Sequence, residues 1–409
     1  MDVVNISNAE SPLLNMLVKK GRYDPFKYTM LSSVGSLSRQ RVEVDSQTTA
    51  AFNKELHWKI PRYGILANAY IRTVLGFAGG ATKAICDAVG CQLFSRIDLQ
   101  THNRVIATQY PEYAQLRINE APYEQRQAFR TATIESATAD EEGSGVTQVV
   151  VYTPLFMSFN ERSQNFLDCR FIEDLEIVGS VKAASKLAIG DSPSISEMKL
   201  VIMMFSPTEQ DYRSYQDANF SLQKPLSMLY YNVFHETPKT ISSSGTSQRT
   251  DTVDLRCNNL VFATHIMIRD TDARDHAATP QPGLFEVIGG PNEGSSPDKI
   301  VIKATGKELF SCPARELMLM DGGSYGRFSG TSNNKVDADT AQYSVWYSLD
   351  RSRTANSGSV SFKNLSSPVL ELTWTPDSNS NYEILVFHEL WQVIDVNGAD
   401  GRIETGISV

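Results

Sequence analysis

The chain has 409 residues, of which 41% are apolar and 21% charged, and its formal net charge is −9. This is the composition of a globular protein, and the length fits two domains of about 200 residues, each able to bury its own core. The negative charge disfavours sequence-independent binding to nucleic acid, because both surfaces carry the same sign. No apolar run reaches the ~18 residues of a membrane span, and no signal-peptide pattern begins the chain, so we expect a cytosol-like site of synthesis.

The cysteines are odd in number and scattered along the chain, which argues against a disulfide framework. We expect free thiols, most of them buried. They are Cys86, Cys91, Cys169, Cys257 and Cys312.

The chain divides into four predicted parts. Residues 1–35 are predicted to form an N-terminal arm, 36–212 a first β domain, 213–224 a linker, and 225–409 a second β domain with a C-terminal tail. Within the arm, the spacing of apolar residues from Ser11 to Lys20 predicts a short amphipathic helix. Two interpretations of the arm remain open: a frayed terminus, or a contact to an adjacent subunit or underlying layer.

Short strands dominate the first β domain, with two helical exceptions. We expect a short helix with a glycine stop from Gly80 to Gly90, feeding a strand from Cys91 to Leu99. The stretch from Tyr110 to Phe129 is rich in Glu, Gln, Arg and Ala and is the most helical of the chain. The polar, Tyr-rich stretch that ends at Lys224 is a plausible connection between the two domains.

Four strand-forming runs separated by turn residues fill the last quarter of the chain. They are Tyr343–Leu349, Ser359–Leu365, Val369–Thr375 and Glu383–Val396. In the third run Leu370, Leu372 and Trp374 alternate with polar residues, which predicts a sheet with one face in a core. The final run is apolar on both faces, so we expect a strand covered on both sides.

Several short motifs together carry a resemblance to a known family. They are Tyr343-Ser-Val-Trp-Tyr-Ser-Leu349, the turn Asn356-Ser-Gly358, Val360-Ser-Phe362-Lys-Asn364-Leu-Ser-Ser-Pro368, the tail Gly401-Arg-Ile-Glu-Thr-Gly406, and Pro154-Leu-Phe-Met-Ser-Phe159 in the first half. Each motif is weak alone, but they occur in the family's order from residue 28 to residue 406. On these residues the chain resembles the double jelly-roll major capsid protein of large icosahedral double-stranded DNA viruses (the nucleocytoplasmic large DNA virus and virophage type).

The resemblance implies an all-β fold of two consecutive eight-stranded jelly-roll β-sandwiches, with short helices in loops and at the N-terminus. It also implies a structural function, in which trimeric, pseudo-hexagonal capsomers tile the facets of the shell. The implied partners are two further copies in a homotrimer, neighbouring capsomers, penton and minor capsid or cement proteins, and an internal membrane on the inner side. No direct sequence-specific nucleic-acid binding and no cofactor is expected. The implied location is the virion, after assembly in the host cytoplasm or a virus factory.

The longer loops, at residues 100–147 and 270–299, are then expected at the outer end of the tile. The arm and the tail are expected on its inner side. A minor capsid or penton paralogue remains an open alternative.

No stretch of the sequence predicts an active site, so we expect a protein that is not an enzyme, with no catalytic, cofactor-binding or metal-binding residues. Gly322-Gly-Ser324-Tyr-Gly326 fits a nucleophile-elbow pattern, but turn-forming residues follow it where that motif needs a helix. His388-Glu389 lacks the second histidine of a zinc motif and lies in a strand pattern. The adjacent carboxylates Glu173 and Asp174 are expected to be solvated charges.

The competing hypothesis is a carbohydrate-binding or carbohydrate-cleaving β-sandwich protein, because jelly rolls also host lectins and glycosidases. An exposed aromatic platform beside paired carboxylates would favour it.

Overall fold

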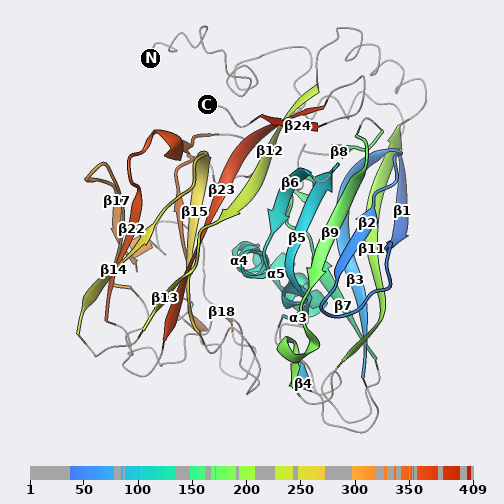
Figure 1. Cartoon of the computed structure of the whole chain (residues 1–409), viewed down its shortest axis with the longest axis horizontal. Coiled ribbons are helices and arrows are strands. Elements are labelled where there is room, and N and C mark those ends of the chain that lie inside the picture. The colour runs from blue at the N-terminus through green and yellow to red at the C-terminus, as the bar shows by residue number, and fades with distance from the viewer. Residues whose placement is uncertain are drawn as a thin grey trace.

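The structure is a computed structural model, and almost all of its regular elements are β-strands (Figure 1). It describes residues 37–406 with gaps. The gaps are 78–83, 86–87, 103, 134–147, 162–166, 171, 190–192, 208–225, 243–246, 272–296, 315, 318–326, 329–335, 338–341, 350, 352, 354–356, 376–380 and 397–402.

Two antiparallel four-stranded sheets form the first barrel. One has the order β1 (Leu37–Asp45), β11 (Ser194–Pro207), β3 (Ile65–Gly76) and β7 (Gln148–Pro154), and the short β8 (Leu167–Asp168) also pairs with β3. The other has the order β2 (Glu55–Lys59), β9 (Leu175–Val181), β5 (Phe94–Thr101) and β6 (Arg104–Gln109). Among the eight main strands the chain changes sheet at every step except from β5 to β6, which are paired in one sheet, and the first strand lies beside the last. This is the connectivity of a jelly roll.

The second barrel repeats this connectivity strand for strand. One sheet has the order β12 (Leu226–His235), β23 (Tyr382–Val396), β15 (Leu260–Asp270) and β20 (Gln342–Trp346). The other has the order β14 (Arg249–Asp254), β22 (Val369–Trp374), β16 (Lys299–Ala304) and β17 (Lys307–Pro313). The predicted all-β fold of two eight-stranded jelly rolls is therefore confirmed.

Shorter strands extend these sheets or form small pairs. In the second barrel β13 (Lys239–Ile241) and β24 (Ile403–Gly406) pair with β23, and β21 (Val360–Ser361) pairs with β15. Two isolated pairs are β4 (Ala84–Ile85) with β10 (Ala188–Ile189), and β18 (Arg327–Phe328) with β19 (Val336–Asp337).

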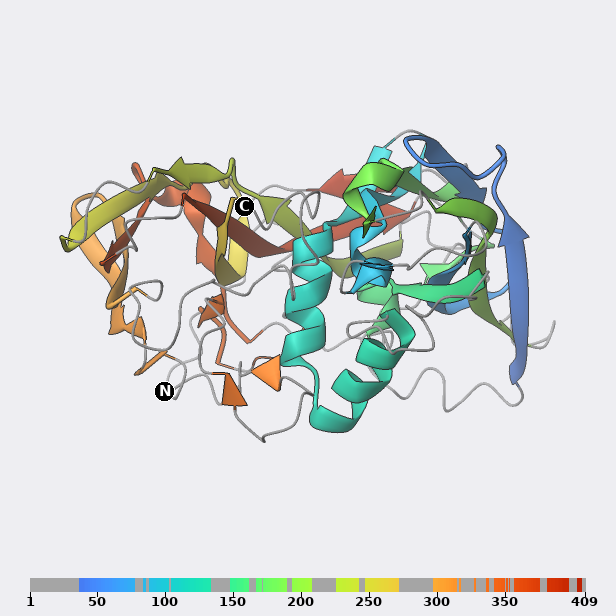
Figure 2. The same cartoon turned by 90° about the horizontal axis from the view of Figure 1, so that it is seen from below.

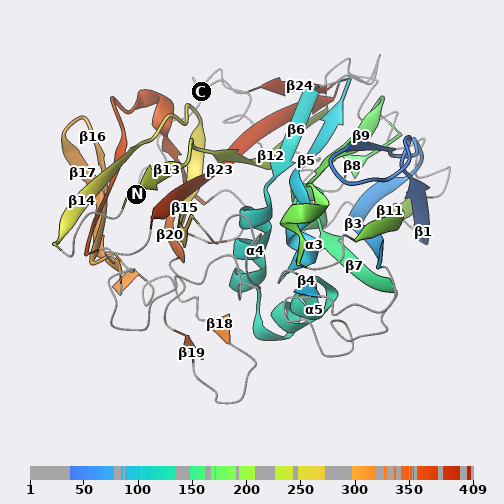
Figure 3. The same cartoon turned by 60° about the horizontal axis from the view of Figure 1, so that its bottom comes forward.

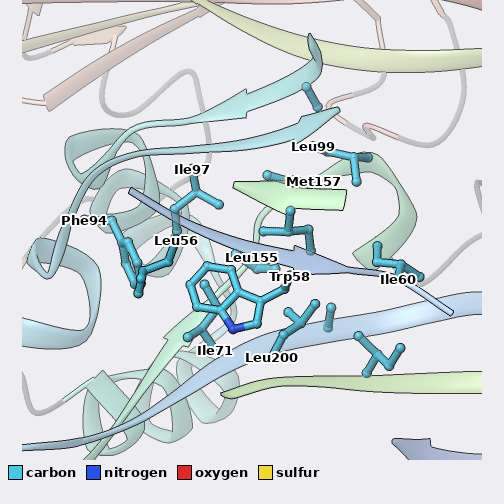
Figure 4. Close-up of a cluster of buried hydrophobic side chains, with 14 of the residues drawn as sticks. Leu56, Trp58, Ile60, Ile71, Phe94, Ile97, Leu99, Leu155, Met157 and Leu200 are labelled. Carbon is cyan, nitrogen blue, oxygen red and sulfur yellow. The ribbon is translucent and has the colours of Figure 1, made fainter. Parts of the chain in front are cut away.

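Period-two alternation builds the core of each barrel. In the first barrel Leu56 and Trp58 of β2 point inward against Ile71 and Phe94 from the other strands (Figure 4). In the second barrel Leu370, Leu372 and Trp374 of β22 are fully buried, while the residues between them are partly exposed, as the sequence predicted.

The two barrels stand side by side and share part of one core. Strands β12 and β23 run out of the second barrel towards the first (Figure 1). There Tyr230 of β12 and Ile394 of β23 join the apolar cluster of the first barrel. Across the same contact, Gln392 donates a hydrogen bond to the backbone carbonyl of Ile106, and Asn232 accepts one from the backbone N–H of Thr108. The first barrel is thus completed by side chains from the second half of the chain.

Three short helices lie close together: α3 (Val89–Gln92), α4 (Pro111–Glu120) and α5 (Tyr123–Thr133). Helix α4 lies between the barrels, and α3 and α5 lie beside it against β7 of the first barrel (Figures 2 and 3). Pro111 occupies the first turn of α4, where its missing N–H costs nothing. Apolar residues of α4 pack against the outer face of the β12–β23–β15 sheet in a third buried cluster.

The predicted helical stretch Tyr110–Phe129 is confirmed, and the described part of the predicted loop 100–147 is mostly strand and helix, while its position at the outer end of a tile stays a prediction. Residues 101–133 form β6, α4 and α5, and the inward side of α4 is buried between the barrels because Tyr113, Leu116 and Ile118 fill the space there.

Three local predictions need correction. The described part of Gly80–Gly90 begins with strand β4, and helix forms only from Val89, after Ala88 adopts a left-handed conformation (φ 53°). The strand predicted from Cys91 begins at Phe94. In the run Ser359–Leu365 only β21 is a strand, since the chain turns into a 3₁₀ helix at Phe362–Asn364 that buries Phe362.

Other predictions lie outside the described residues: the arm 1–35, the linker 213–224, most of the loop 270–299 and the Gly322–Gly326 motif. Within the described ranges, no helix combines the length and the apolar character needed to cross a membrane.

Candidate functional site

A cluster of charged and hydroxyl side chains is buried where α4 meets the second barrel. Its members come from seven parts of the fold: Tyr113, Arg117 and Glu120 from α4, Glu161 after β7, Tyr231 from β12, His265 from β15, Ser344 from β20, Arg353 from the loop after β20, and Glu389 from β23. We call this set the inter-barrel network. Apolar residues surround most of this set, so its buried polar groups depend largely on one another for hydrogen bonds.

Arg353 connects the second barrel to α4. Its Nε lies 2.8 and 2.9 Å from the two carboxylate oxygens of Glu389, and its Nη2 lies 2.6 Å from Oε2 of Glu120. The guanidinium also lies over the ring of Trp346, 5.0 Å from its centroid. One planar cation therefore binds one carboxylate from each side of the joint, a geometry that suits arginine better than lysine.

Arg117 makes the second set of contacts, towards the first barrel. Its Nη2 donates to Oε1 of Glu161 at 2.8 Å, and its Nη1 lies 3.3 and 3.2 Å from the hydroxyls of Tyr113 and Tyr231. Both hydroxyls donate onward to carboxylates: Tyr113 to Glu389 at 2.6 Å and Tyr231 to Glu161 at 2.8 Å. The hydrogen bonds thus run from the first barrel through α4 into β23.

The arginines keep the buried carboxylates ionised. Burial by itself raises the pKa of Glu389, but Arg353 and the other nearby cations outweigh burial and hold that pKa well below its usual range. For Glu161 burial also acts upward, and Arg117 again brings the net pKa below the ordinary value. Burial raises the pKa of Tyr113, so this tyrosine remains a hydrogen-bond donor.

A second ion cluster fixes the other end of α4. Arg269 of β15 binds Glu383 through Nε at 2.8 Å and Nη2 at 2.7 Å, and binds Glu112 through Nη1 at 2.9 Å. Glu112 lies in the first turn of the helix, where a negative charge is favoured by the helix dipole. Both ends of α4 are therefore tied to the second barrel by ion pairs.

Among the described residues, two chains of hydroxyl, imidazole and carboxylate are fully buried around the histidines of β15 and β23. In one, Ser344 Oγ lies 2.7 Å from His265 Nδ1, and His265 Nε2 lies 3.1 Å from Glu389. In the other, Thr264 Oγ1 lies 2.9 Å from His388 Nδ1, and His388 Nε2 lies 3.3 Å from Glu236.

These chains have the residue types of a catalytic triad but not its accessibility. In both chains Nδ1 faces the hydroxyl and Nε2 faces the carboxylate, which is the reverse of the serine-protease arrangement. Ser344, Thr264 and both histidines have 0% exposed surface, so no substrate can reach either hydroxyl in this structure. Each chain therefore stays a set of buried contacts inside the protein.

One open cleft, with a volume of about 760 Å³, borders the network between α5 and the outer face of β3 and β7. Glu120 and Glu161 line it, together with the aromatic pair Tyr70 and Tyr152, whose ring centroids are 5.7 Å apart. Two carboxylates beside aromatic rings are the features that the carbohydrate hypothesis requires. The lowered pKa of Glu161 makes it a poor proton donor, so in a glycosidase it could serve only as the base or the nucleophile.

The residues singled out from the sequence are dispersed in the fold. His388 and Glu389 lie in β23, as predicted, but on its opposite faces: His388 contacts Phe362 in the second barrel and Glu389 joins the inter-barrel network. Glu173 and Asp174 form partly exposed ion pairs, with Arg62 at 2.9 Å and Lys59 at 2.5 Å.

The cysteine prediction is confirmed for the four described residues, Cys91, Cys169, Cys257 and Cys312, which are buried thiols outside any disulfide. Burial raises the pKa of both Cys169 and Cys257 to about 12, so neither is a reactive thiolate. Among the described residues, no three His, Cys, Asp or Glu side chains are grouped so that they could hold a metal ion.

Sequence reasoning missed the inter-barrel network. Its partners are far apart in the sequence, so no spacing reveals them. One signal was available in the sequence, because the strand predicted to be covered on both sides contains polar residues. Buried polar groups require partners, so these residues predicted a buried polar network. They are Glu383, His388, Glu389 and Gln392.

Comparison with solved structures finds the same double-barrel fold in viral capsid proteins. The chain aligns with a protein in the quasi-atomic model of the PBCV-1 virus capsid at 14% identity and a TM-score of 0.71, covering 91% of this chain and 97% of that one. The Faustovirus major capsid protein aligns at 10% identity and a TM-score of 0.63, covering 92% of each chain. The mavirus major capsid protein aligns at 9% identity and a TM-score of 0.54, covering 100% of this chain and 95% of that one.

At these identities the alignments establish the fold, which is the double jelly roll that the sequence predicted. No family model matches the sequence, and no curated protein matches it.

Proposed function

We propose that this chain is a structural protein, the major capsid protein of an icosahedral double-stranded DNA virus, and that it acts as a building block and not as an enzyme. The observation that carries the proposal is the pair of eight-stranded jelly rolls standing side by side in one chain. The alignment with the Faustovirus major capsid protein includes almost all of both chains, so neither has a large domain that the other lacks.

The joint between the barrels suits such a role. A tile must keep its two barrels at a fixed angle, because the angle sets where its neighbours bind. Here three features fix the joint: side chains of β12 and β23 in the first barrel's core, the Arg353 and Arg117 contacts, and the Arg269 cluster. Ion pairs of this kind, with several charged hydrogen bonds each, favour one arrangement over others.

We propose that three copies form a homotrimer with six barrels, a pseudo-hexagonal tile. Contacts between unlike flanks of neighbouring copies close into a ring when the rotation is three-fold. Further partners in this proposal are neighbouring capsomers, penton and minor capsid proteins, and an internal membrane. The proposed location is the virion, after assembly in the host cytoplasm or a virus factory.

Light scattering on the purified protein tests the trimer. Three chains of 45.4 kDa give 136.2 kDa. We expect this mass to persist on dilution, because obligate interfaces bury some 2,000 Å² or more in total. A monodisperse species of 45.4 kDa would contradict the proposal.

A carbohydrate-binding function is the second candidate, and the cleft favours it because Glu120 and Glu161 lie there beside Tyr152. A glycan array tests it, with Tyr152→Ala as the variant that removes the aromatic surface. Binding that this substitution abolishes would support the candidate. Absence of binding across the array would leave the structural proposal alone.

A further inference from the structure

Strand β1 of the first barrel has one open edge. It pairs with β11 along all nine of its residues, without a bulge. Among the described residues, no strand pairs with its other edge. Figures 1 and 2 show β1 at the margin of the molecule, on the side away from the second barrel. A row of backbone N–H and C=O groups at such an edge is available to another strand.

Three other edge strands carry features that hinder such pairing. The ladders that β6 and β17 form with their neighbours contain irregularities in register. Prolines end β7 and β17, at Pro154 and Pro313. Bulges and prolines protect sheet edges against pairing with another chain. Strand β1 contains neither, so charge is what decides which strand its edge accepts.

The outer face of β1 carries four charges in a symmetrical order, two positive followed by two negative. They are Arg39, Arg41, Glu43 and Asp45, all of them exposed. Side chains alternate between the two faces of a strand, so Val42 and Val44 lie on the opposite face. Both valines pack against the core of the first barrel and remain partly exposed.

Two copies of this strand complement each other when they run antiparallel. With Val42 opposite Val42 of the second copy, Arg39 faces Asp45 and Arg41 faces Glu43, and the symmetry makes each contact twice. A shift of two residues places either Arg41 opposite Arg41 or Glu43 opposite Glu43. Parallel pairing in register would place every charge opposite its like. Opposite charges across a sheet stabilise the pairing and like charges destabilise it, so one register is favoured.

We propose that β1 is a self-pairing edge, to which a second copy of this chain adds its own β1 about a two-fold axis. The sheet β1–β11–β3–β7 then continues into the same sheet of the second copy, and the partly exposed valines are covered. One pair of strands buries less surface than a stable interface does, so the contact is weak and forms at high protein concentration. It joins like surfaces, whereas the proposed trimer joins unlike flanks. The inference holds whether or not the protein is a capsid component.

A mixture of two cysteine variants, Arg41→Cys and Glu43→Cys, tests the register. Opposite residues of antiparallel strands have Cα atoms about 4.5–5.5 Å apart, within the range of a disulfide. After oxidation at high concentration, we expect linked chains of 90.8 kDa, twice 45.4 kDa, on a denaturing gel without reductant. Each variant alone should stay unlinked, because its two cysteines are not opposite each other. This gel reports the contact whether or not trimers form.

The matched control is Lys59→Cys mixed with Asp174→Cys, at an exposed ion pair away from β1, and it should stay unlinked. An unlinked mixture of the two β1 variants would overturn the proposal. Equal linkage in either β1 variant alone, or in the control, would overturn the register.

Charge reversal tests the contact without cysteines. Within one copy Arg41 also lies 2.7 Å from Glu43, so the experiment must separate this ion pair from the contact between copies. Arg41→Glu or Glu43→Arg places like charges opposite each other and should abolish the concentration-dependent association of the wild-type protein in sedimentation velocity.

Mixing these two variants restores opposite charges between copies only, since each chain keeps like charges at its own positions 41 and 43. We expect association to return in the mixture. Association that survives in either variant alone, or that stays absent from the mixture, would contradict a self-pairing edge.

Discussion

Arg353 shows at the scale of single residues how the joint is held. Its guanidinium binds Glu389 and Glu120, whose side chains are 0% and 11% exposed. Removing one partner from such a group leaves the others charged and without compensation, which costs more than the attraction itself contributes.

We therefore expect Arg353→Met to lower the free energy of unfolding by about 3–5 kcal/mol. The matched control is Arg41→Met, which removes an ion pair with Glu43 on the exposed flank and should change stability little. Urea unfolding of the three proteins measures both effects. Equal losses in the two variants would show that the buried pairs have no special role.

Because His388 is buried, we expect the stability of the protein to depend on pH in the acid range. Desolvation holds the pKa of its imidazole below the ordinary value of 6.5, despite the contact with Glu236. As the pH falls below about 6.5, the unfolded chain binds a proton that the folded chain does not, so unfolding becomes more favourable. The stability that the folded protein has while His388 is neutral in both states is complete above this pH. It is lost as the pH falls towards the folded-state pKa of His388.

We expect the free energy of unfolding of the wild-type protein to fall between pH 7 and pH 5, before the carboxylates titrate. His388→Gln should fall less steeply over the same range, because the residue that takes up the proton on unfolding is gone. Urea titrations at each pH give the two slopes. Parallel slopes would mean that other groups cause the acid sensitivity.

Single residues were the least predictable part of the molecule. The sequence indicates that His388 and Glu389 belong to a strand, which argues against a zinc motif, and β23 confirms this. It does not indicate that Arg353 reaches Glu120, because 233 positions separate them. Side-chain partners across a joint depend on how the barrels dock, and no local pattern encodes that.

Strand β23 illustrates how an element can serve two cores. Its alternate side chains face the second barrel and the joint, which explains why the sequence is apolar on both faces. Beyond the second barrel the same strand contributes Ile394, which is 0% exposed, to the core of the first barrel. A strand in the second half of the chain therefore stabilises the first.

Ile394→Ala tests this sharing. We expect a loss of about 2–5 kcal/mol from the cavity that it leaves. Hydrogen exchange should show faster opening of β5 and β9 in the first barrel. The control, Leu372→Ala, removes a side chain of the second barrel's core and should affect β16 and β22 first. Exchange in the first barrel that is unchanged by Ile394→Ala would contradict a shared core.

Elements were predicted well where alternation or composition is strong, and poorly where tertiary contacts decide. The pattern of Leu370, Leu372 and Trp374 identified β22 correctly. The predicted helix from Gly80 failed because β4 pairs with β10, about a hundred positions away, and this pairing overrides local helix propensity. The helix α4 was recognised, but its place between the barrels depends on contacts with β15 and β23 that the sequence does not show.

At the scale of the whole molecule, two jelly rolls are joined into one block by a shared core and by ion pairs. The division into two successive β domains was readable from the sequence because each half has its own succession of strands and turns. The angle between the barrels was not readable from the sequence, because it depends on the side-chain contacts of the inter-barrel network.

The central claim is that such blocks assemble in threes into flat tiles, and electron microscopy of the purified particles tests it most directly. Class averages should show a hexagonal outline with three-fold symmetry and six densities, two for each chain. Single two-lobed particles, or a three-fold particle with an elongated shaft in place of a flat tile, would contradict the account.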